Sequence, residues 1–178
     1  MYRALITGLM VSVLSASATP PVAASTWPGA EETVNASPPD AELLAELTAP
    51  QPARLQSLLI HAISLIGVKY KFGGSSAESG FDCSGFVRHV FAESMALDLP
   101  RSSYAIAKLG ASVNKDDLKP GDLVFYNTRR RAFSHVGIYL GEGRFVHAPS
   151  RGKTVEIVDS TDQYWLKRFN GARRVAVE

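Results

Sequence analysis

Cys83, the only cysteine of this 178-residue chain, is the residue with the clearest potential for chemistry. It stands in the segment Phe81-Asp82-Cys83-Ser84-Gly85, directly ahead of apolar residues at helical spacing. We therefore predict Cys83 in the first turn of a helix, where free backbone N–H groups favour a thiolate and can stabilise an oxyanion. The small neighbours Ser84 and Gly85 leave the sulfur approachable. This setting indicates a nucleophilic thiol.

A thiol nucleophile needs a base, which is usually a histidine held by a third group. His61 lies off the apolar face of the first predicted helix, and His89 lies in the second, six residues after Cys83 and so on a different face. We expect both at the surface. His135 and His147 are therefore the candidate partners of the thiol.

The two remaining histidines lie in consecutive predicted strands. His135 begins the strand 135–140, and His147 falls in the strand 144–148. Residues 141–143 have the length and the glycines of a hairpin connection, so the strands are expected to be neighbours. The two imidazoles can then point into one space, where one accepts the thiol proton and the other orients it.

Two other interpretations of these residues stay open. His135 and His147 could be half-buried sheet residues with no joint role. Alternatively, Cys83, His135 and His147 could hold a zinc ion with one open position. The spacing lacks a compact ligand pair such as C-x-x-C or H-x-x-x-H. Thiol chemistry without a metal ion or an organic cofactor is therefore the prediction.

Helical patterns precede strand-like patterns along the chain. A helix over 55–66 is followed by the helix that begins near Cys83, and Ser102 or Ser103 can cap a third, short one. The segment 164–166 is helical or looped. Helices first and a mostly antiparallel sheet of about five or six strands afterwards indicate the α+β class. The predicted strands are 123–126, 135–140, 144–148, 154–158 and 173–177.

The N-terminal third of the chain differs from the rest. Residues 1–24 combine Arg3, a short apolar run and small residues, which is typical of a secretory signal peptide that is removed. Seven of the ten prolines fall between Pro20 and Pro52, and residues 25–52 are predicted to form an acidic, Pro-rich, disordered tether. Residues 53–178 then form the catalytic domain. The mature protein is expected outside the cytoplasm, in a periplasm, as a monomer that is not inserted in the membrane.

Charge separates the two mature segments. Residues 53–178 hold 18 Lys and Arg against 12 Asp and Glu, a formal net charge of +6, whereas residues 25–52 carry −5. A basic domain attracts anionic polymers. Export and the lack of a recognised binding motif argue against nucleic acid, so an anionic cell wall is the expected partner. Simple solubility is the alternative.

Six segments resemble the NlpC-type cysteine peptidases of bacterial cell walls in order and spacing. Together they span roughly residues 55–177. They are Gly67-Val68-Lys69-Tyr70-Lys71-Phe72-Gly73-Gly74, Phe81-Asp82-Cys83-Ser84-Gly85-Phe86-Val87, Leu99-Pro100-Arg101-Ser102-Ser103, Leu118-Lys119-Pro120-Gly121-Asp122-Leu123-Val124-Phe125-Tyr126, Ser134-His135-Val136-Gly137-Ile138-Tyr139 and His147-Ala148-Pro149.

The resemblance implies a papain-like α+β fold and hydrolysis of peptidoglycan stem peptides, either between D-glutamate and a diamino acid or at a cross-link. It assigns Cys83 as nucleophile, His135 as base and His147 as the orienting third residue. It places four further residues at the oxyanion or substrate cleft: Tyr70, Asp82, Ser84 and Ser102.

Three matters remain open at the level of the sequence. The run Arg129-Arg130-Arg131, just before His135, is expected to be a solvated loop, with attraction of substrate carboxylates as the alternative. A wall-binding module that has lost catalysis is one rival function, although such a module does not need Cys83, His135 and His147 together. An amidase or acyltransferase of related papain-like fold is the other.

Overall fold

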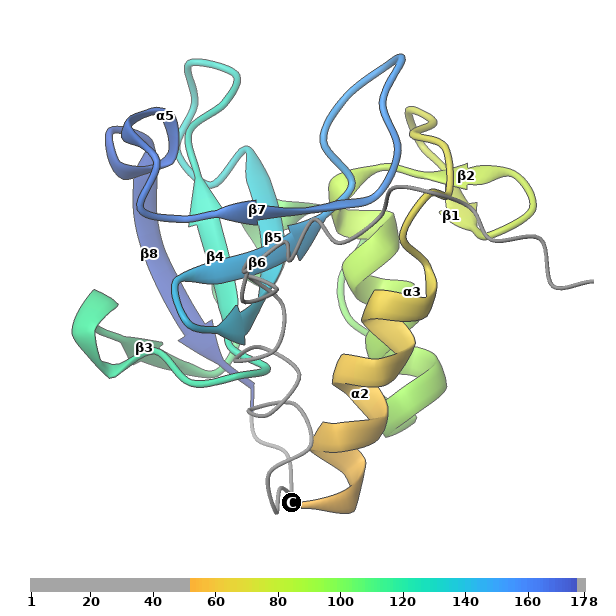
Figure 1. The fold of residues 1–178 in the computed structure, drawn as a ribbon, viewed down its shortest axis with the longest axis horizontal. Helices are drawn as coiled ribbons and strands as arrows, with labels where there is room; N and C mark the ends of the chain where they lie inside the picture. Colours follow the sequence, from red (N-terminus) through yellow and green to blue (C-terminus); the bar gives the residue numbers. More distant parts are fainter. Residues whose placement is uncertain (1–51, 176–178) are drawn as a thin grey trace, which may run out of the picture. The chain divides into compact units, whose positions relative to one another are not determined.

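The computed structural model describes residues 52–175 (Figure 1). The predicted signal peptide and nearly all of the predicted tether lie outside the described residues. Within residues 52–175, none of the helices combines the length and the apolar content that crossing a membrane requires.

Two long helices form one layer of the fold. Helix α2 spans Ala53–Ser64 and buries Leu58, Leu59 and Ala62, which recur at the spacing of one helical face. Helix α3 spans Cys83–Met95 and packs beside α2 and against the sheet (Figure 1). The predicted helices at 55–66 and from Cys83 are thereby confirmed. Helix α4 is a single turn over Ser103–Ile106 with Ser102 as its N-cap.

A six-stranded antiparallel sheet forms the second layer, in the order β3-β8-β4-β5-β6-β7. Strands β5 and β6 are the predicted hairpin, joined through Gly141 and Gly143, which both have positive φ. A second, two-stranded sheet pairs β1 with β2 ahead of α3. The strands are β1 (Ser75–Ser76), β2 (Gly80–Phe81), β3 (Ala111–Val113), β4 (Leu123–Tyr126), β5 (His135–Gly141), β6 (Arg144–His147), β7 (Glu156–Asp159) and β8 (Phe169–Arg174).

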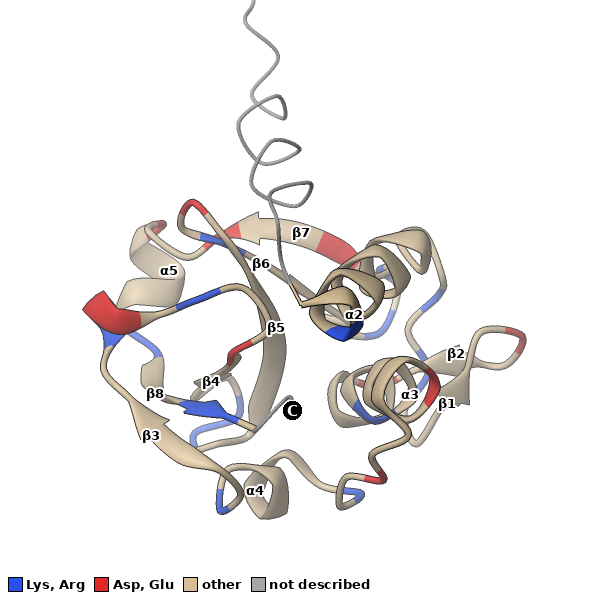
Figure 2. Cartoon of the chain, turned by 90° about the horizontal axis from the view of Figure 1, so that it is seen from below, with Lys and Arg blue, Asp and Glu red and all other residues tan. Residues whose placement is uncertain are grey.

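Alternation along the strands divides the apolar residues between two faces of the sheet. Leu123 and Phe125 of β4 join the main core with α2 and α3. Val124 and Tyr126 point to the other face, where the short helix α5 (Gln163–Leu166) contributes Trp165. The views agree that α5 lies on the far side of the sheet from α2 and α3 (Figure 2). The sheet is therefore covered on both faces.

Several strands differ from the sequence-based expectation. β1, β2 and β3 were not predicted, because the first two have only two residues each and β3 is an exposed edge without apolar alternation. The final strand was predicted at 173–177. It begins earlier, at Phe169, and its described part ends at Arg174, while residues 176 and 177 lie outside the described residues. Its Asn170, Gly171 and paired arginines give no apolar pattern, and the pairing with β4 shifts register between Phe125 and Tyr126.

Candidate active site

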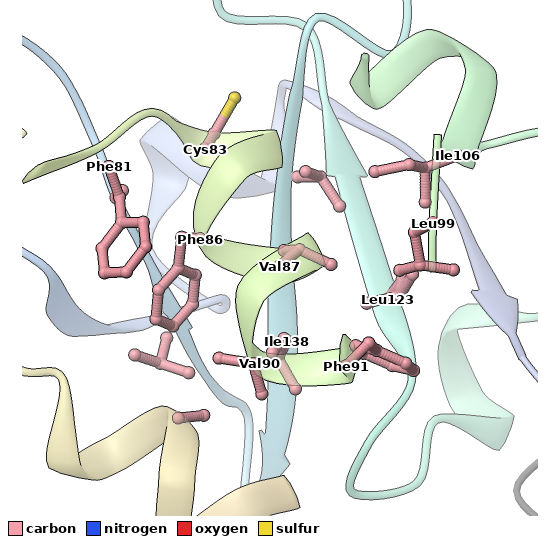
Figure 3. Close-up of a cluster of buried hydrophobic side chains, with 14 of the residues drawn as sticks. Phe81, Cys83, Phe86, Val87, Val90, Phe91, Leu99, Ile106, Leu123 and Ile138 are labelled. Carbon is pink, nitrogen blue, oxygen red and sulfur yellow. The ribbon is translucent and has the colours of Figure 1, made fainter. Parts of the chain in front are cut away.

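Cys83 is the first residue of α3, as predicted. Asp82 is the N-cap and accepts a hydrogen bond from the Gly85 backbone N–H at 2.7 Å. The carbonyl oxygen of Gly74 approaches the helix so closely that a Cβ on Gly85 would lie 2.0 Å from it. Figure 3 shows the Cys83 side chain at this end of α3, pointing away from the apolar cluster. The backbone thus presents the sulfur at the edge of the core.

The Asp82 carboxylate accepts hydrogen bonds from three segments around this end of α3. Gly73 N donates to its Oδ2 at 3.0 Å, and the Ser84 hydroxyl donates to its Oδ1 at 3.2 Å. Arg101 adds a two-pronged contact, with Nη1 on Oδ1 at 3.0 Å and Nη2 on Oδ2 at 2.6 Å. Burial raises the pKa of Asp82, but the hydrogen bonds from Arg101, Gly85 and Gly73 outweigh it and leave the pKa below its usual value.

The Cys83 thiol is buried, with 8% of the residue exposed. Burial, reinforced by the negative charge of Asp82, raises the pKa of the thiol. The backbone N–H groups of Val136 and Ser84 and the charge of Arg129 act in the opposite direction without reversing the shift. The expected preference of the helix N-terminus for a thiolate is therefore outweighed by burial.

His135 and His147 face each other across β5 and β6, as the strand pattern predicted. His135 Nε2 and His147 Nδ1 are 2.7 Å apart, and the rings are nearly perpendicular at 89°. The residues are 3% and 0% exposed. The backbone N–H of Val136 donates a hydrogen bond to the Cys83 sulfur, so the thiol lies beside the peptide bond that joins His135 to Val136. The pair leaves His135 Nδ1 as the ring nitrogen available to accept a proton.

Both imidazoles are held in the neutral form. Burial, with a smaller effect of the Arg129 charge, lowers the pKa of His135 from its usual 6.5 to about 4. Burial, then the proximity of His135 and the charge of Lys153, lower the pKa of His147 to about 2. At neutral pH each ring therefore carries one proton, and the 2.7 Å contact has one donor and one acceptor.

Trp165 covers the histidine pair from the far side of the sheet. Its ring stacks on His135 with centroids 5.9 Å apart and meets His147 edge-to-face at 5.1 Å. Phe145 completes the contact from β6. This apolar cover restricts the movement of both rings. The sequence analysis missed Trp165, and its only signal was an aromatic pair within the short segment 164–166.

The four residues that the resemblance places at the cleft surround the thiol. Together with Cys83 they line a hollow of about 410 Å³. Tyr70 is half-buried there. Ser102 caps α4 by accepting from Ala105 N at 3.2 Å, and Asp82 and Ser84 are engaged with Arg101. The structure thus brings all four to the hollow, while Asp82 serves chiefly to hold the helix end.

Three arginines also line this hollow. Arg101 and Arg131 are at its wall, and Arg129 lines both it and a second hollow of about 420 Å³ beside the histidine pair. Arg129 Nη2 donates to the Tyr70 hydroxyl at 3.0 Å, and its guanidinium lies 5.7 Å from the Phe72 ring centre. All three arginines of the run are exposed, as expected of a solvated loop, and Arg129 in addition contacts Tyr70 at the wall of the hollow.

The other two histidines lie apart from this site. His61 of α2 and His89 of α3 are half-buried and face each other with ring centroids 5.3 Å apart. His89 also contacts Phe81. They pack between the two helices rather than standing free at the surface, which corrects the sequence-based expectation.

The zinc alternative requires Cys83, His135 and His147 to converge on one point. The histidines instead direct a nitrogen each at the other, at 2.7 Å. In the described part of the chain, no group of three His, Cys, Asp or Glu side chains is arranged to hold a metal ion.

Comparison with known proteins places the chain in a family. The sequence model of the NlpC/P60 family matches residues 67–174. The chain belongs to the NlpC/P60 family. Relatives include a murein DD-endopeptidase/murein LD-carboxypeptidase of Escherichia coli, MepS, with 47% identity over 109 residues, which are 61% of this chain and 56% of the relative. A gamma-DL-glutamyl hydrolase of Bacillus subtilis is 44% identical over 110 residues, covering 61% of this chain and 26% of that protein. The match thus spans about half or less of these relatives.

Solved NlpC/P60 structures share the fold. A family member from Bacillus cereus superimposes with a TM-score of 0.63 at 32% identity, covering 70% of this chain and 41% of that one. The predicted papain-like α+β fold and the predicted family are both confirmed.

Proposed function

We propose that this NlpC/P60 protein is a cysteine endopeptidase that hydrolyses peptide bonds in the stem peptides of peptidoglycan. The observation that carries the proposal is the buried His135–His147 pair beside the thiol at the first turn of α3. Relatives named as a murein DD-endopeptidase and a gamma-DL-glutamyl hydrolase support the substrate class.

In this mechanism His135 Nδ1 takes the thiol proton as the Cys83 sulfur attacks the amide carbon. The carbonyl oxygen becomes an oxyanion beside the backbone N–H groups of the first turn of α3. His135 then gives its proton to the leaving amine, and the C–N bond breaks to leave a thioester on Cys83.

Hydrolysis of the thioester regenerates the enzyme. His135 removes a proton from water, the hydroxide attacks the thioester carbon, and the thiol leaves with the proton. Throughout, His147 holds the His135 ring through the 2.7 Å contact, and Trp165 packs on both rings.

The hollow around Cys83 suits an anionic peptide. Arg129 and Arg131 line it, and Tyr70 is held by Arg129. Guanidinium groups bind carboxylates in a forked geometry, and stem peptides carry carboxylates close to their scissile bonds. We assign Arg129 to substrate carboxylate binding on this basis.

Digestion of purified peptidoglycan tests the proposal. The parent protein should release soluble muropeptides, whereas Cys83→Ala and His135→Ala should release none. The control His89→Ala should match the parent, because His89 lines neither hollow. Mass spectrometry then identifies the bond. A new amine on a diamino acid next to D-glutamate, or an opened cross-link, supports a peptidase. Release of the lactyl-sugar end would indicate an amidase instead, and Cys83→Ala activity equal to the parent would exclude the thiol mechanism.

We also propose that the protein acts in the periplasm after removal of residues 1–24. Cell fractionation with N-terminal sequencing of the mature protein tests this. A cytoplasmic protein that retains Met1 would contradict it.

A further inference from the structure

The outer nitrogen of His147 is not used by the mechanism described above. His147 is 0% exposed, and its Nδ1 faces His135. Its Nε2 is buried and has no hydrogen-bond partner among the described residues. Buried polar atoms are nearly always paired, so an orphaned ring nitrogen next to a candidate catalytic base indicates a function.

Glu156 is the acidic group that this nitrogen faces. It begins β7 directly opposite His147 of β6, and the acidic ends of β7 are visible in Figure 2. Directly opposed residues of antiparallel strands place their side chains on one face of the sheet. Glu156 Oε1 is 3.8 Å from His147 Nε2 and 3.4 Å from Lys153 Nζ. All three residues line the 420 Å³ hollow beside the histidine pair.

The proton positions on the two rings follow from the role of His135. Its Nδ1 must be free to accept the thiol proton, so the single ring proton sits on Nε2 and is donated to His147 Nδ1. His147 must then carry its own proton on Nε2, pointing toward Glu156. The opposite tautomer of His147 would place two N–H groups face to face at 2.7 Å.

We propose that Glu156 is a positioning residue that holds the proton on His147 Nε2, extending the Cys83–His135–His147 series by a carboxylate. Its oxygen accepts the His147 Nε2–H hydrogen bond, after a small side-chain rotation or across one bridging water. The inference rests on the proposed peptidase function. When His135 becomes an imidazolium, the carboxylate also offsets the new charge through the intervening ring.

The side chain of Glu156 is 36% exposed, which limits the size of the effect. Loss of one partly exposed, charge-assisted hydrogen bond should lower kcat about fivefold, because the ring stays in place through Trp165 and His135. KM should stay within about twofold, since Glu156 acts on His147 and not on the substrate.

Three variants separate this role from a plain ion pair with Lys153. Glu156→Met removes both charge and acceptor, while Glu156→Gln keeps a neutral acceptor, so kcat should fall in the order parent, Gln, Met. Glu93→Met is the matched control, because Glu93 is an exposed glutamate of α3 away from both hollows. It should match the parent in kcat and KM.

The tautomer of His147 can be measured without turnover, by 15N NMR of ring-labelled protein. The parent should show the Nε2–H form, and Glu156→Met should show a measurable shift toward the Nδ1–H form. An unchanged tautomer in Glu156→Met, or an unchanged kcat in an active parent, overturns the inference. If the parent itself digests no peptidoglycan, the proposed function fails, while the NMR comparison still decides whether Glu156 sets the tautomer.

Discussion

The charge pair between Arg101 and Asp82 should be one of the strongest single interactions at the helix end that bears the thiol. Arg101→Met keeps the length of the side chain and removes two charge-assisted hydrogen bonds, at 3.0 and 2.6 Å. The Asp82 side chain is 13% exposed, but that of Arg101 is 43% exposed, so solvent screens part of the interaction. In Arg101→Met the Asp82 carboxylate still accepts hydrogen bonds from Gly73 N, Gly85 N and the Ser84 hydroxyl. We expect a loss of about 2 kcal/mol in the free energy of unfolding.

Urea denaturation at pH 7 measures this loss, and a double-mutant cycle with Asp82→Asn isolates the pair. Arg101→Met should cost clearly less in the Asp82→Asn background, where only the neutral amide oxygen and the Ser84 hydroxyl are left to accept from Arg101. Asp98→Asn is the control, because it breaks the Arg88–Asp98 pair, which is also short at 2.8 Å but has an 83% exposed carboxylate. It should have little effect. A coupling energy below about 0.5 kcal/mol between positions 82 and 101 would refute the reasoning.

Three further predictions concern the same site. Gly85→Ala should destabilise the fold by about 3 kcal/mol and abolish activity, since its Cβ would lie 2.0 Å from the Gly74 carbonyl oxygen; denaturation with normal stability would contradict this. The free energy of unfolding should fall as the pH drops from 6.5 to about 4, because in this range His135 binds a proton in the unfolded chain but not in the folded one. The slope is up to about 1.4 kcal/mol per pH unit for each buried histidine. A free energy of unfolding that stays constant from pH 7 to 5 would exclude this effect. Arg129→Gln should raise KM about threefold with a smaller change in kcat, whereas Arg130→Gln, which lines neither hollow, should not; equal effects would remove the assigned role of Arg129.

Local patterns were enough to predict the centre of the site. The apolar spacing after Cys83 predicts its place in the first turn of α3, because the N-cap residue and the helical spacing can both be recognised within one short segment of sequence. The pairing of His135 with His147 follows from the period of two and the short hairpin between their strands. Both inferences depend only on neighbours in the sequence, which is why they could be made before the fold was known.

Contacts between distant segments could not be predicted in this way. Arg101 reaches Asp82 across 19 positions, and Arg129 reaches Tyr70 across 59. Trp165 lies on the histidines only because α5 folds back over the far face of the sheet. The raised pKa of Cys83 likewise depends on the depth of burial, whereas the sequence shows only the helix N-terminus that favours the thiolate.

The central claim is that the Cys83 sulfur is the attacking atom, and trapping the thioester tests it most directly. The parent protein is mixed with a defined muropeptide, quenched in acid during the first turnover and mapped by mass spectrometry. The account predicts that the peptide containing Cys83 gains the mass of the acyl part of the substrate, and that Cys83→Ala gains none. Rapid turnover with no adduct on Cys83, together with full activity of Cys83→Ala, would contradict it.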